Sequence, residues 1–326
     1  MMNDSGFVMG IDVGSTKVLV GYVDRRGRIL AKRRFAMDRK DTSTTLNSIY
    51  GAIESFLTGE GGKPLAAGLG LVGRCDPSTG RWERAFNLPI PMPVDIAGEI
   101  RRRFGLECWI DNDVFCAALA EISFGAGKKY RDFLLLNVGT GLSAGIVAEG
   151  RLLRGAGNAA GEVGQWRCPG TGEKGRALTL EQVCSGGGMI ERARRMMAQE
   201  KSSLAALAEG DLHSLSIYEA AQAGDALGKR IIDDALRGLC EALCALAAVF
   251  NPAAVVLAGS VACTPGFAGE IDRYVRANAY PGCLPDLKEI YLSALDAREV
   301  GLIGAAAAGW NGLPEGGEKK EGQENA

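Results

Sequence analysis

The sequence has a single histidine, no long apolar run and almost no net charge. Its apolar stretches fall short of the ~18 residues needed to span a bilayer, and no basic-then-apolar signal pattern opens the chain. The 37 basic and 39 acidic residues leave a net charge of −2, so no general electrostatic field favours nucleic acid or an anionic membrane. We therefore expect a cytoplasmic protein whose partners include neither nucleic acid nor membrane.

The cysteines also lack the spacing of a metal site. There are nine, an odd number, scattered without a Cys-x-x-Cys pair, and several lie inside apolar runs. This pattern is typical of buried thiols in a reducing compartment. The one histidine, His213, lies in the segment EGDLHSLS, outside every motif described below. We expect it to be a surface or helix-capping residue.

The most informative stretch is residues 8–24, VMGIDVGSTKVLVGYVD. An apolar strand leads to Asp12 and a Gly-Ser-Thr turn, and a second apolar strand follows. Gly14 lets the backbone approach an anion, Ser15 and Thr16 supply hydroxyls and amides, and Asp12 can hold a magnesium ion through water. The pattern therefore indicates a phosphate-binding hairpin, although an ordinary glycine turn between two strands is a competing interpretation.

Two later segments strengthen the first interpretation. Residues 133–150 repeat the pattern of strand, Gly139-Thr140-Gly141 and second strand. Residues 252–261, PAAVVLAGSV, form a buried strand that ends in small residues, against which a flat adenine can lie. The last segment alone is also compatible with a core strand and a tight turn. Together the three segments indicate two related halves and a nucleotide site in the cleft between them.

Length and periodicity indicate the fold class. With 326 residues, the chain exceeds the usual size of a single core, so two domains are expected. Helical spacing runs through residues 42–57, 94–104, 113–124 and most of 180–250, and a last helix is expected over 300–310. The Gly-, Pro- and Asn-containing segment from 74 to 93 is expected to be a loop. Alternating strands and helices predict an α/β architecture with an antiparallel hairpin beginning each half.

Six motifs in a fixed order carry a resemblance to a known family. They are GIDVGSTK, GRCDPSTG with FNLP, DNDVFCAALAE, NVGTG, AAGEVGQW and NPAAVVLAGS. With these motifs the chain resembles the ROK family of sugar kinases from residue 8 to about 310. The resemblance implies a two-domain, actin-like ATPase fold related to ribonuclease H, with duplicated mixed sheets, flanking helices and an interdomain cleft. It also implies an ATP-dependent kinase that uses magnesium, acts on a hexose or N-acetylhexosamine, and forms a homodimer.

The resemblance also implies two domains with the following boundaries. Residues 1–117 are expected to form an N-terminal domain, which the C-terminal helix 300–312 joins. Residues 118–299 are expected to form a larger domain with the second phosphate loop and the adenosine site. The last segment, 313–326, has little apolar surface to bury and is expected to be disordered.

The resemblance also implies roles for individual residues. Asp113 matches the catalytic base, and a kinase needs such a carboxylate within hydrogen-bond reach of the attacking hydroxyl. A helix N-cap is the competing interpretation, because Asn112 and Asp113 precede an alanine-rich helix. The two roles are compatible if Asn112 or Asp111 is the cap. The implied sugar-binding residues are Gly73, Asn87, Asn112, Asp113, Glu162, Gln165 and Glu181. The implied nucleotide- and magnesium-binding residues are Asp12, Gly14, Ser15, Thr16, Lys17, Gly139, Thr140, Gly141, Gly259 and Ser260.

The segment from Gln165 to Glu181 departs from the family pattern. The family has a histidine where Gln165 stands, followed by three cysteines that bind zinc, whereas this segment has Cys168 alone and no histidine. A structural zinc site needs about four sulfur or imidazole ligands, so we expect no zinc. Gln165 can donate and accept hydrogen bonds, which would allow it to replace the sugar contact of the histidine without the metal.

The family resemblance is compatible with more than one function and with several sugars. A binding-only relative that has lost activity would share the fold. A DNA-binding repressor of the same family is disfavoured, because only seven residues precede Val8 and repressors carry a helix-turn-helix domain there. The sugar itself is not defined, since the candidate hexoses differ by one stereocentre or one acyl group, and pocket shape decides such discrimination.

Overall fold

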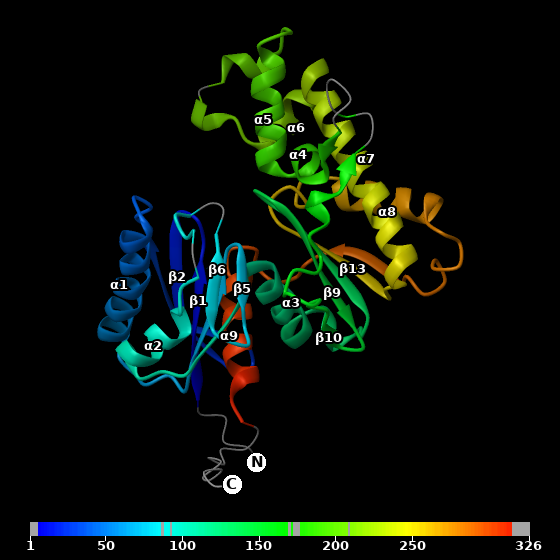
Figure 1. The fold of residues 1–326 in the computed structure, drawn as a ribbon. Helices are drawn as coiled ribbons and strands as arrows, with labels where there is room; N and C mark the ends of the chain where they lie inside the picture. Colours follow the sequence, from blue (N-terminus) through cyan, green and yellow to red (C-terminus); the bar gives the residue numbers. More distant parts are fainter. Residues whose placement is uncertain are drawn as a thin grey trace. The chain divides into compact units, whose positions relative to one another are not determined.

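The computed structural model describes residues 6–85, 88–91, 93–168, 171, 177–207 and 209–314. They divide into two compact units (Figure 1). Unit 1 holds the described residues up to Phe124 and from Arg298 onward, and unit 2 holds Gly125–Ala297. The first boundary thus follows helix α3 (Asp113–Phe124), whereas the sequence suggested a boundary inside it, at residue 117. A helix packs as one body, which places the whole of α3 in unit 1.

Unit 1 is built on a five-stranded sheet in the order β3-β2-β1-β4-β7. Its first three strands form an antiparallel meander, and β4 and β7 run parallel to β1. The carboxyl ends of β1, β4 and β7 therefore meet at one edge of the sheet. The strands are β1 (Phe7–Val13), β2 (Lys17–Asp24), β3 (Ile29–Ala36), β4 (Ala67–Leu71) and β7 (Cys108–Asn112).

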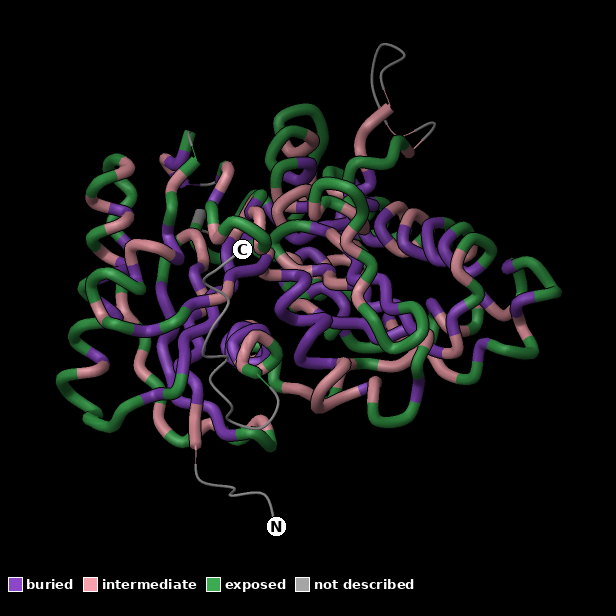
Figure 2. The backbone as a smooth tube through the Cα atoms, turned by 60° about the horizontal axis from the view of Figure 1, so that its bottom comes forward, coloured by how far each residue is buried: buried purple, intermediate pink, exposed green. Residues whose placement is uncertain are grey.

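Side chains of β1 alternate between two helical layers, as strand geometry requires. Met9, Ile11 and Val13 share a core with helix α1 (Thr42–Glu60). Val8 shares a cluster with the last helix, α9 (Val300–Gly312), on the other face. Figure 1 shows α9, in red, beside β1, in blue, although the two lie at opposite ends of the chain. Figure 2 shows that buried residues concentrate in the strands and in the helix faces turned toward them.

The segment expected to be a loop contains a hairpin instead. Strands β5 (Arg74–Asp76) and β6 (Arg81–Arg84) form a separate two-stranded sheet, and helix α2 (Ile96–Phe104) follows. Trp82 in β6 is fully buried, and its indole nitrogen donates to the carbonyl of Val72 at 3.0 Å. Burial of this one large side chain orders a segment whose composition is that of a loop.

Unit 2 repeats the sheet of unit 1. The strand order is β10-β9-β8-β13-β14, in which β10, β9 and β8 are antiparallel and β13 and β14 run parallel to β8. The duplication that the two hairpins predicted is thus present in the sheets. The strands are β8 (Phe133–Val138), β9 (Leu142–Ala148), β10 (Arg151–Leu152), β13 (Ala254–Ala258) and β14 (Glu289–Leu292).

Helices supply most of the remaining core of unit 2. Helices α6 (Ser214–Gln222) and α7 (Ala226–Phe250) are separate, and Asp225 caps α7 by accepting the amide of Gly228 at 2.8 Å. His213 caps α6, since its Nδ1 accepts the amide of Ser216 at 3.0 Å, which confirms the capping role expected for it. The elements are η1 (Ala126–Lys128), η2 (Val163–Gln165), β11 (Arg167–Cys168), β12 (Leu178–Thr179), α4 (Leu180–Cys184), α5 (Gly186–Met197), η3 (Ser203–Ala206), η4 (Glu209–Asp211), α6 (Ser214–Gln222), α7 (Ala226–Phe250) and α8 (Phe267–Asn278).

Two observations on the described part of the chain complete the fold. None of its helices combines the length and the apolar character of a membrane span. All nine cysteines fall within it and are free thiols. Six of them are buried, namely Cys75, Cys108, Cys116, Cys184, Cys240 and Cys283.

Candidate functional site

The residues of the first hairpin lie at the carboxyl edge of the unit 1 sheet. Asp12 is near the end of β1, and Gly14, Ser15 and Thr16 form the turn that follows. The Gly14 amide donates to the carbonyl of Lys17 at 3.0 Å, which closes the turn. Thr16 and Lys17 are exposed, whereas Gly14 and Ser15 are half-buried. The turn therefore presents hydroxyls, amides and one cation at the sheet edge where a phosphate would be bound.

Asp12 belongs to a group of carboxylates on one face of this sheet. Asp12 pairs with Gly70 and Gly70 pairs with Asp111, so both aspartates lie in one row with a glycine between them. Burial raises the pKa of Asp12, and Lys17 opposes this shift. Burial also raises the pKa of the Cys116 thiol, with further contributions from carboxylates that include Asp111 and Asp12. These aspartates therefore lie close enough to act on one buried thiol.

Asn112 connects the ends of β4 and β7. Its side-chain nitrogen donates to the carbonyl of Gly73 at 2.9 Å, and its side-chain oxygen accepts the amide of Val114 at 2.9 Å. Asn112 thereby caps α3 and holds the loop after β4. Asp113 is the half-buried first residue of α3, and its own Oδ1 also approaches the Val114 amide at 2.9 Å. Gly73, Asn112 and Asp113 are thus brought together, while Asn87 lies outside the described residues.

The second loop, residues 139–141, lies at the corresponding edge of unit 2. It is held by helix α5, because the amide of Gly186 donates to the Gly139 carbonyl at 2.8 Å and that of Gly187 to the Thr140 carbonyl at 3.1 Å. Sequence reasoning did not find this contact. The signal for it was the Ser-Gly-Gly-Gly run at 185–188, in which Ser185 caps α5 and the glycines leave room for the loop.

The end of β13 contacts the same loop from the neighbouring strand. Gly259 has φ +89°, and a Cβ there would lie 2.4 Å from the Val138 carbonyl oxygen. The amide of Val261 donates to that oxygen at 2.9 Å. Ser260 between them is exposed. The predicted adenosine residues therefore lie beside the second phosphate loop, at the carboxyl ends of parallel strands, where α/β sheets commonly bind ligands.

Three predicted sugar-binding residues also gather in unit 2. Glu181 on α4 accepts the amide of Leu142 at 2.9 Å through Oε2, which ties α4 to the exit of the second loop. The pKa of Glu162 is raised, mainly by partial burial of the Glu162 carboxyl group and further by the nearby charge of Glu181. The Glu162 side chain still contacts solvent. Exposed Gln165 lies on η2, and its backbone N–H donates to the backbone carbonyl of Glu162 at 3.1 Å.

A preformed structural metal site requires several donor side chains close together. In the described ranges, no cluster of three or more His, Cys, Asp or Glu side chains could hold a metal ion. Most of the residues between Cys168 and Ala177, where the family carries its zinc motif, lie outside those ranges. Magnesium needs no such cluster, because it keeps several waters and binds through one or two carboxylates together with substrate phosphates. Asp12 beside a phosphate-type turn fits that requirement.

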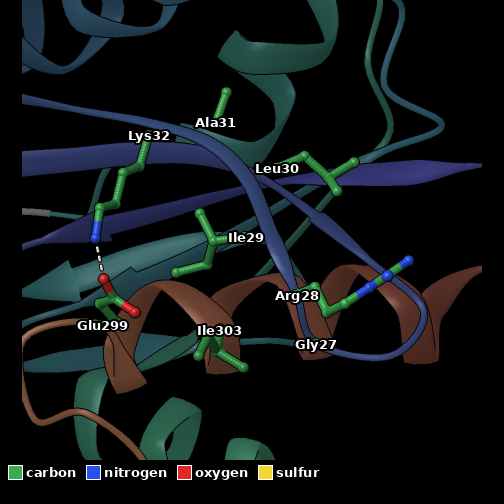
Figure 3. A pocket seen from close by; sticks show the side chains of 8 residues that line it. All are labelled: Gly27, Arg28, Ile29, Leu30, Ala31, Lys32, Glu299 and Ile303. Atoms are coloured by element: carbon green, nitrogen blue, oxygen red, sulfur yellow. Dashed lines mark hydrogen bonds and ion pairs between the residues drawn. The ribbon is translucent and has the colours of Figure 1, made fainter.

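A separate pocket of about 540 Å³ lies elsewhere in unit 1 (Figure 3). Lys32 and Glu299 form an ion pair across it. None of the predicted site residues lines this pocket. Its lining residues are Gly27, Arg28, Ile29, Leu30, Ala31, Lys32, Glu299 and Ile303.

Two enzymes of similar sequence match most of the chain. A glucokinase from Halalkalibacterium halodurans is 30% identical over 274 residues, which cover 80% of this chain and 82% of the relative. The bifunctional enzyme NanE/NanK from Brucella melitensis biotype 1 is 30% identical over 299 residues. That match covers 92% of this chain but 53% of the enzyme, so the chain spans about half of its length.

Solved structures share the architecture. A ROK family glucokinase from Streptomyces griseus, in complex with glucose and AMPPNP, superposes with a TM-score of 0.76 at 27% identity. The superposition covers 94% of this chain and 100% of that one. A model of the ROK family matches residues 8–309, a range that takes in every described site residue of both units. The chain therefore belongs to the ROK family and has the two-sheet, actin-like ATPase architecture of its sugar kinases.

Proposed function

We propose that this protein is an ATP-dependent sugar kinase, which transfers the γ-phosphoryl group of ATP to a hexose or N-acetylhexosamine, most simply to its 6-hydroxyl. The names of the relatives and the glucokinase bound to glucose and AMPPNP support this class of reaction. One observation carries the proposal. The Asn112–Gly73 hydrogen bond fixes the end of β7, so that Asp113 begins α3 at the same sheet edge as the phosphate-type turn after Asp12.

In the proposed mechanism, Asp113 accepts the proton of the sugar hydroxyl as its oxygen attacks phosphorus. Asn112 fixes the backbone that carries this base and offers its amide group to the sugar. Asp12 would hold magnesium through water, and the bound ion would neutralise charge on the phosphates. The amides and hydroxyls of Gly14, Ser15 and Thr16 would bind the phosphate chain, with Lys17 as an additional cation.

Unit 2 supplies the second set of proposed contacts. The amides and hydroxyl of residues 139–141 would bind phosphate, and the small residues Gly259 and Ser260 would lie against adenosine. Glu162, Gln165 and Glu181 would bind sugar hydroxyls, each of which costs roughly 1–3 kcal/mol if left unpaired in a closed site. We further propose that the enzyme is a cytoplasmic homodimer that uses magnesium and contains no zinc.

The test is a coupled assay of ADP release with magnesium-ATP against a panel of hexoses and N-acetylhexosamines. A kinase gives sugar-dependent ADP release with one or a few members of the panel. Nucleotide binding without turnover on any sugar would instead favour a relative that binds and no longer catalyses.

The variant Asp113→Asn tests the base. We expect kcat to fall by about 10²–10⁴-fold, because proton transfer by a positioned side chain contributes this much, while the affinity for ADP stays unchanged. Asp41→Asn is the matched control, since Asp41 caps α1 by accepting the Thr44 amide at 2.8 Å and asparagine caps helices equally well. Undiminished turnover in Asp113→Asn would exclude the role assigned to Asp113.

A further inference from the structure

The carboxylate of Asp12 lies where a side chain of residue 301 would be. Gly301 is the second residue of α9, and a Cβ built on it would lie 2.7 Å from Cγ of Asp12 and 2.8 and 2.9 Å from its two oxygens. Side-chain carbon atoms do not approach other atoms this closely in folded proteins. Any residue other than glycine at 301 would therefore displace either α9 or the carboxylate.

The displacement would fall on the carboxylate, because α9 is fixed by its packing. Leu302 and Ala306 are fully buried in a cluster with Val8 of β1. On another side, a Cβ at Gly304 would lie 1.8 Å from the Cys116 carbonyl oxygen, so the backbones of α9 and α3 are already in close contact. The Asp12 side chain, by contrast, has two rotatable bonds, and Asp12 is the next-to-last residue of β1.

The contact also suits a negative charge. The first turn of a helix carries the positive end of its dipole, which stabilises nearby anions. Strand alternation turns Asp12 toward α9, as Val8 is turned toward it four residues earlier. Burial opposes ionisation of Asp12, and Lys17 and Arg34 favour it. The start of α9 therefore shapes the place in which the carboxylate lies, and its dipole offsets part of the cost of burying the charge.

We propose that Gly301 is a positioning residue for magnesium: its missing side chain fixes the Asp12 carboxylate in the orientation that binds the ion of the bound nucleotide. This inference rests on the proposed function through the role given to Asp12. It adds a residue from the C-terminal helix, far from every phosphate-loop motif in the sequence, to the set on which metal binding depends.

The test is calorimetric binding of ADP to full-length Gly301→Ala, with saturating magnesium and with EDTA. We expect the magnesium-dependent gain in ADP affinity to fall by about 10–100-fold, the usual effect of losing a residue that orients a metal ligand. The affinity in EDTA should stay unchanged. Gly51→Ala in α1 and Gly269→Ala in α8 are matched controls, since a Cβ at either position meets no atom within 4 Å.

A double variant separates positioning from general destabilisation. In an Asp12→Asn background, Gly301→Ala should cause no further loss of magnesium dependence, while any change in melting temperature appears in both backgrounds. A Gly301→Ala variant that keeps the wild-type magnesium dependence would overturn the inference and leave the role of Asp12 intact. Magnesium-dependent binding that survives in Asp12→Asn would contradict the proposed role of Asp12 itself.

Instability of Gly301→Ala would not end the test. If the single variant cannot be purified, Asp12→Ala with Gly301→Ala removes the carboxylate from the contested space and is expected to fold. Failure of that double variant would show that the clash lies with another group, which would contradict the inference.

Discussion

At the scale of single residues, two aspartates of the first hairpin, Asp12 and Asp24, have opposite environments. Burial raises the pKa of Asp12, and the opposing charges of Lys17 and Arg34 do not cancel the effect. Asp24 is also buried, which alone would raise its pKa, but hydrogen bonds from Arg28 and Arg26 outweigh this and lower it. Folding thus disfavours the ionised form of Asp12 and favours the ionised form of Asp24. This difference is expected if Asp12 has a functional role and Asp24 a structural one.

Asp12→Asn should therefore stabilise the fold at pH 7. An acid whose pKa is raised in the folded state loses stability as pH rises through that pKa, whereas asparagine does not titrate. The free energy of unfolding of Asp12→Asn should exceed that of the wild type at neutral pH. The difference should vanish below about pH 3, where Asp12 is neutral in both the folded and the unfolded state. Urea unfolding at the two pH values measures it, and a variant less stable than wild type at pH 7 would contradict the account.

Asp24→Asn is the control of opposite sign. A lowered pKa contributes stability above the unfolded-state pKa, and this is lost as pH falls through the folded-state value. Asp24→Asn should thus destabilise at pH 7, with the difference disappearing in acid. The same shift in both variants would show that substitution, rather than charge, governs the result.

At the scale of elements, the second phosphate loop contains two kinds of glycine. A Cβ at Gly139 would meet no described protein atom within 4 Å, and its φ is not positive, so the fold does not require glycine there. Gly259 has φ +89° and no room for a Cβ against the Val138 carbonyl. The space beside Gly139 is consistent with a bound phosphate, whereas that beside Gly259 is filled by the protein.

Alanine substitutions should separate these roles. Gly139→Ala is expected to leave the melting temperature unchanged or slightly higher, because alanine restricts the unfolded chain, and to weaken ATP binding by about tenfold or more, which is about 1.4 kcal/mol. Gly259→Ala should cost about 1–3 kcal/mol of stability, as strained left-handed residues do. Thermal unfolding with and without nucleotide measures both, and full ATP affinity in Gly139→Ala would argue against phosphate at that loop.

Local patterns predicted the elements whose signal lies within one segment. The hairpin at 8–24, helix α3 and the C-terminal helix follow from apolar spacing and turn residues. The β5–β6 hairpin was missed because the long-range burial of Trp82, and not its own composition, orders it. The contact of Gly186 and Gly187 with the second loop was missed for the same reason, since it joins segments more than forty residues apart in the chain.

At the scale of the whole molecule, the two units differ in how the chain builds them. Unit 2 is one continuous segment with its own core of helices around a sheet. Unit 1 needs α9, which the chain supplies only after unit 2 is complete. The resemblance to the family implied that a C-terminal helix joins the first domain, but it did not define the sugar, because discrimination between hexoses depends on the shape of a binding site rather than on the order of motifs.

Fragments should reproduce this difference. Residues 125–297 are expected to fold cooperatively when expressed alone, because their core is contiguous. Residues 1–124 should not, since without α9 the cluster of Val8, Leu19 and Val23 is exposed to water. A chimera that joins residue 124 to residues 298–314 through a flexible linker should restore cooperative unfolding. Circular dichroism and urea titration measure each fragment, and a stable 1–124 fragment would contradict the role of α9.

The most direct test of the central claim is the fate of the transferred phosphoryl group. Phosphorus NMR of the wild-type protein with magnesium-ATP and the responding sugar follows it without a coupling enzyme. The account predicts ADP and one new phosphomonoester signal, with coupling to two methylene protons if the 6-hydroxyl is the acceptor. ADP with inorganic phosphate and no sugar ester would contradict it, because water and not a sugar would then be the acceptor.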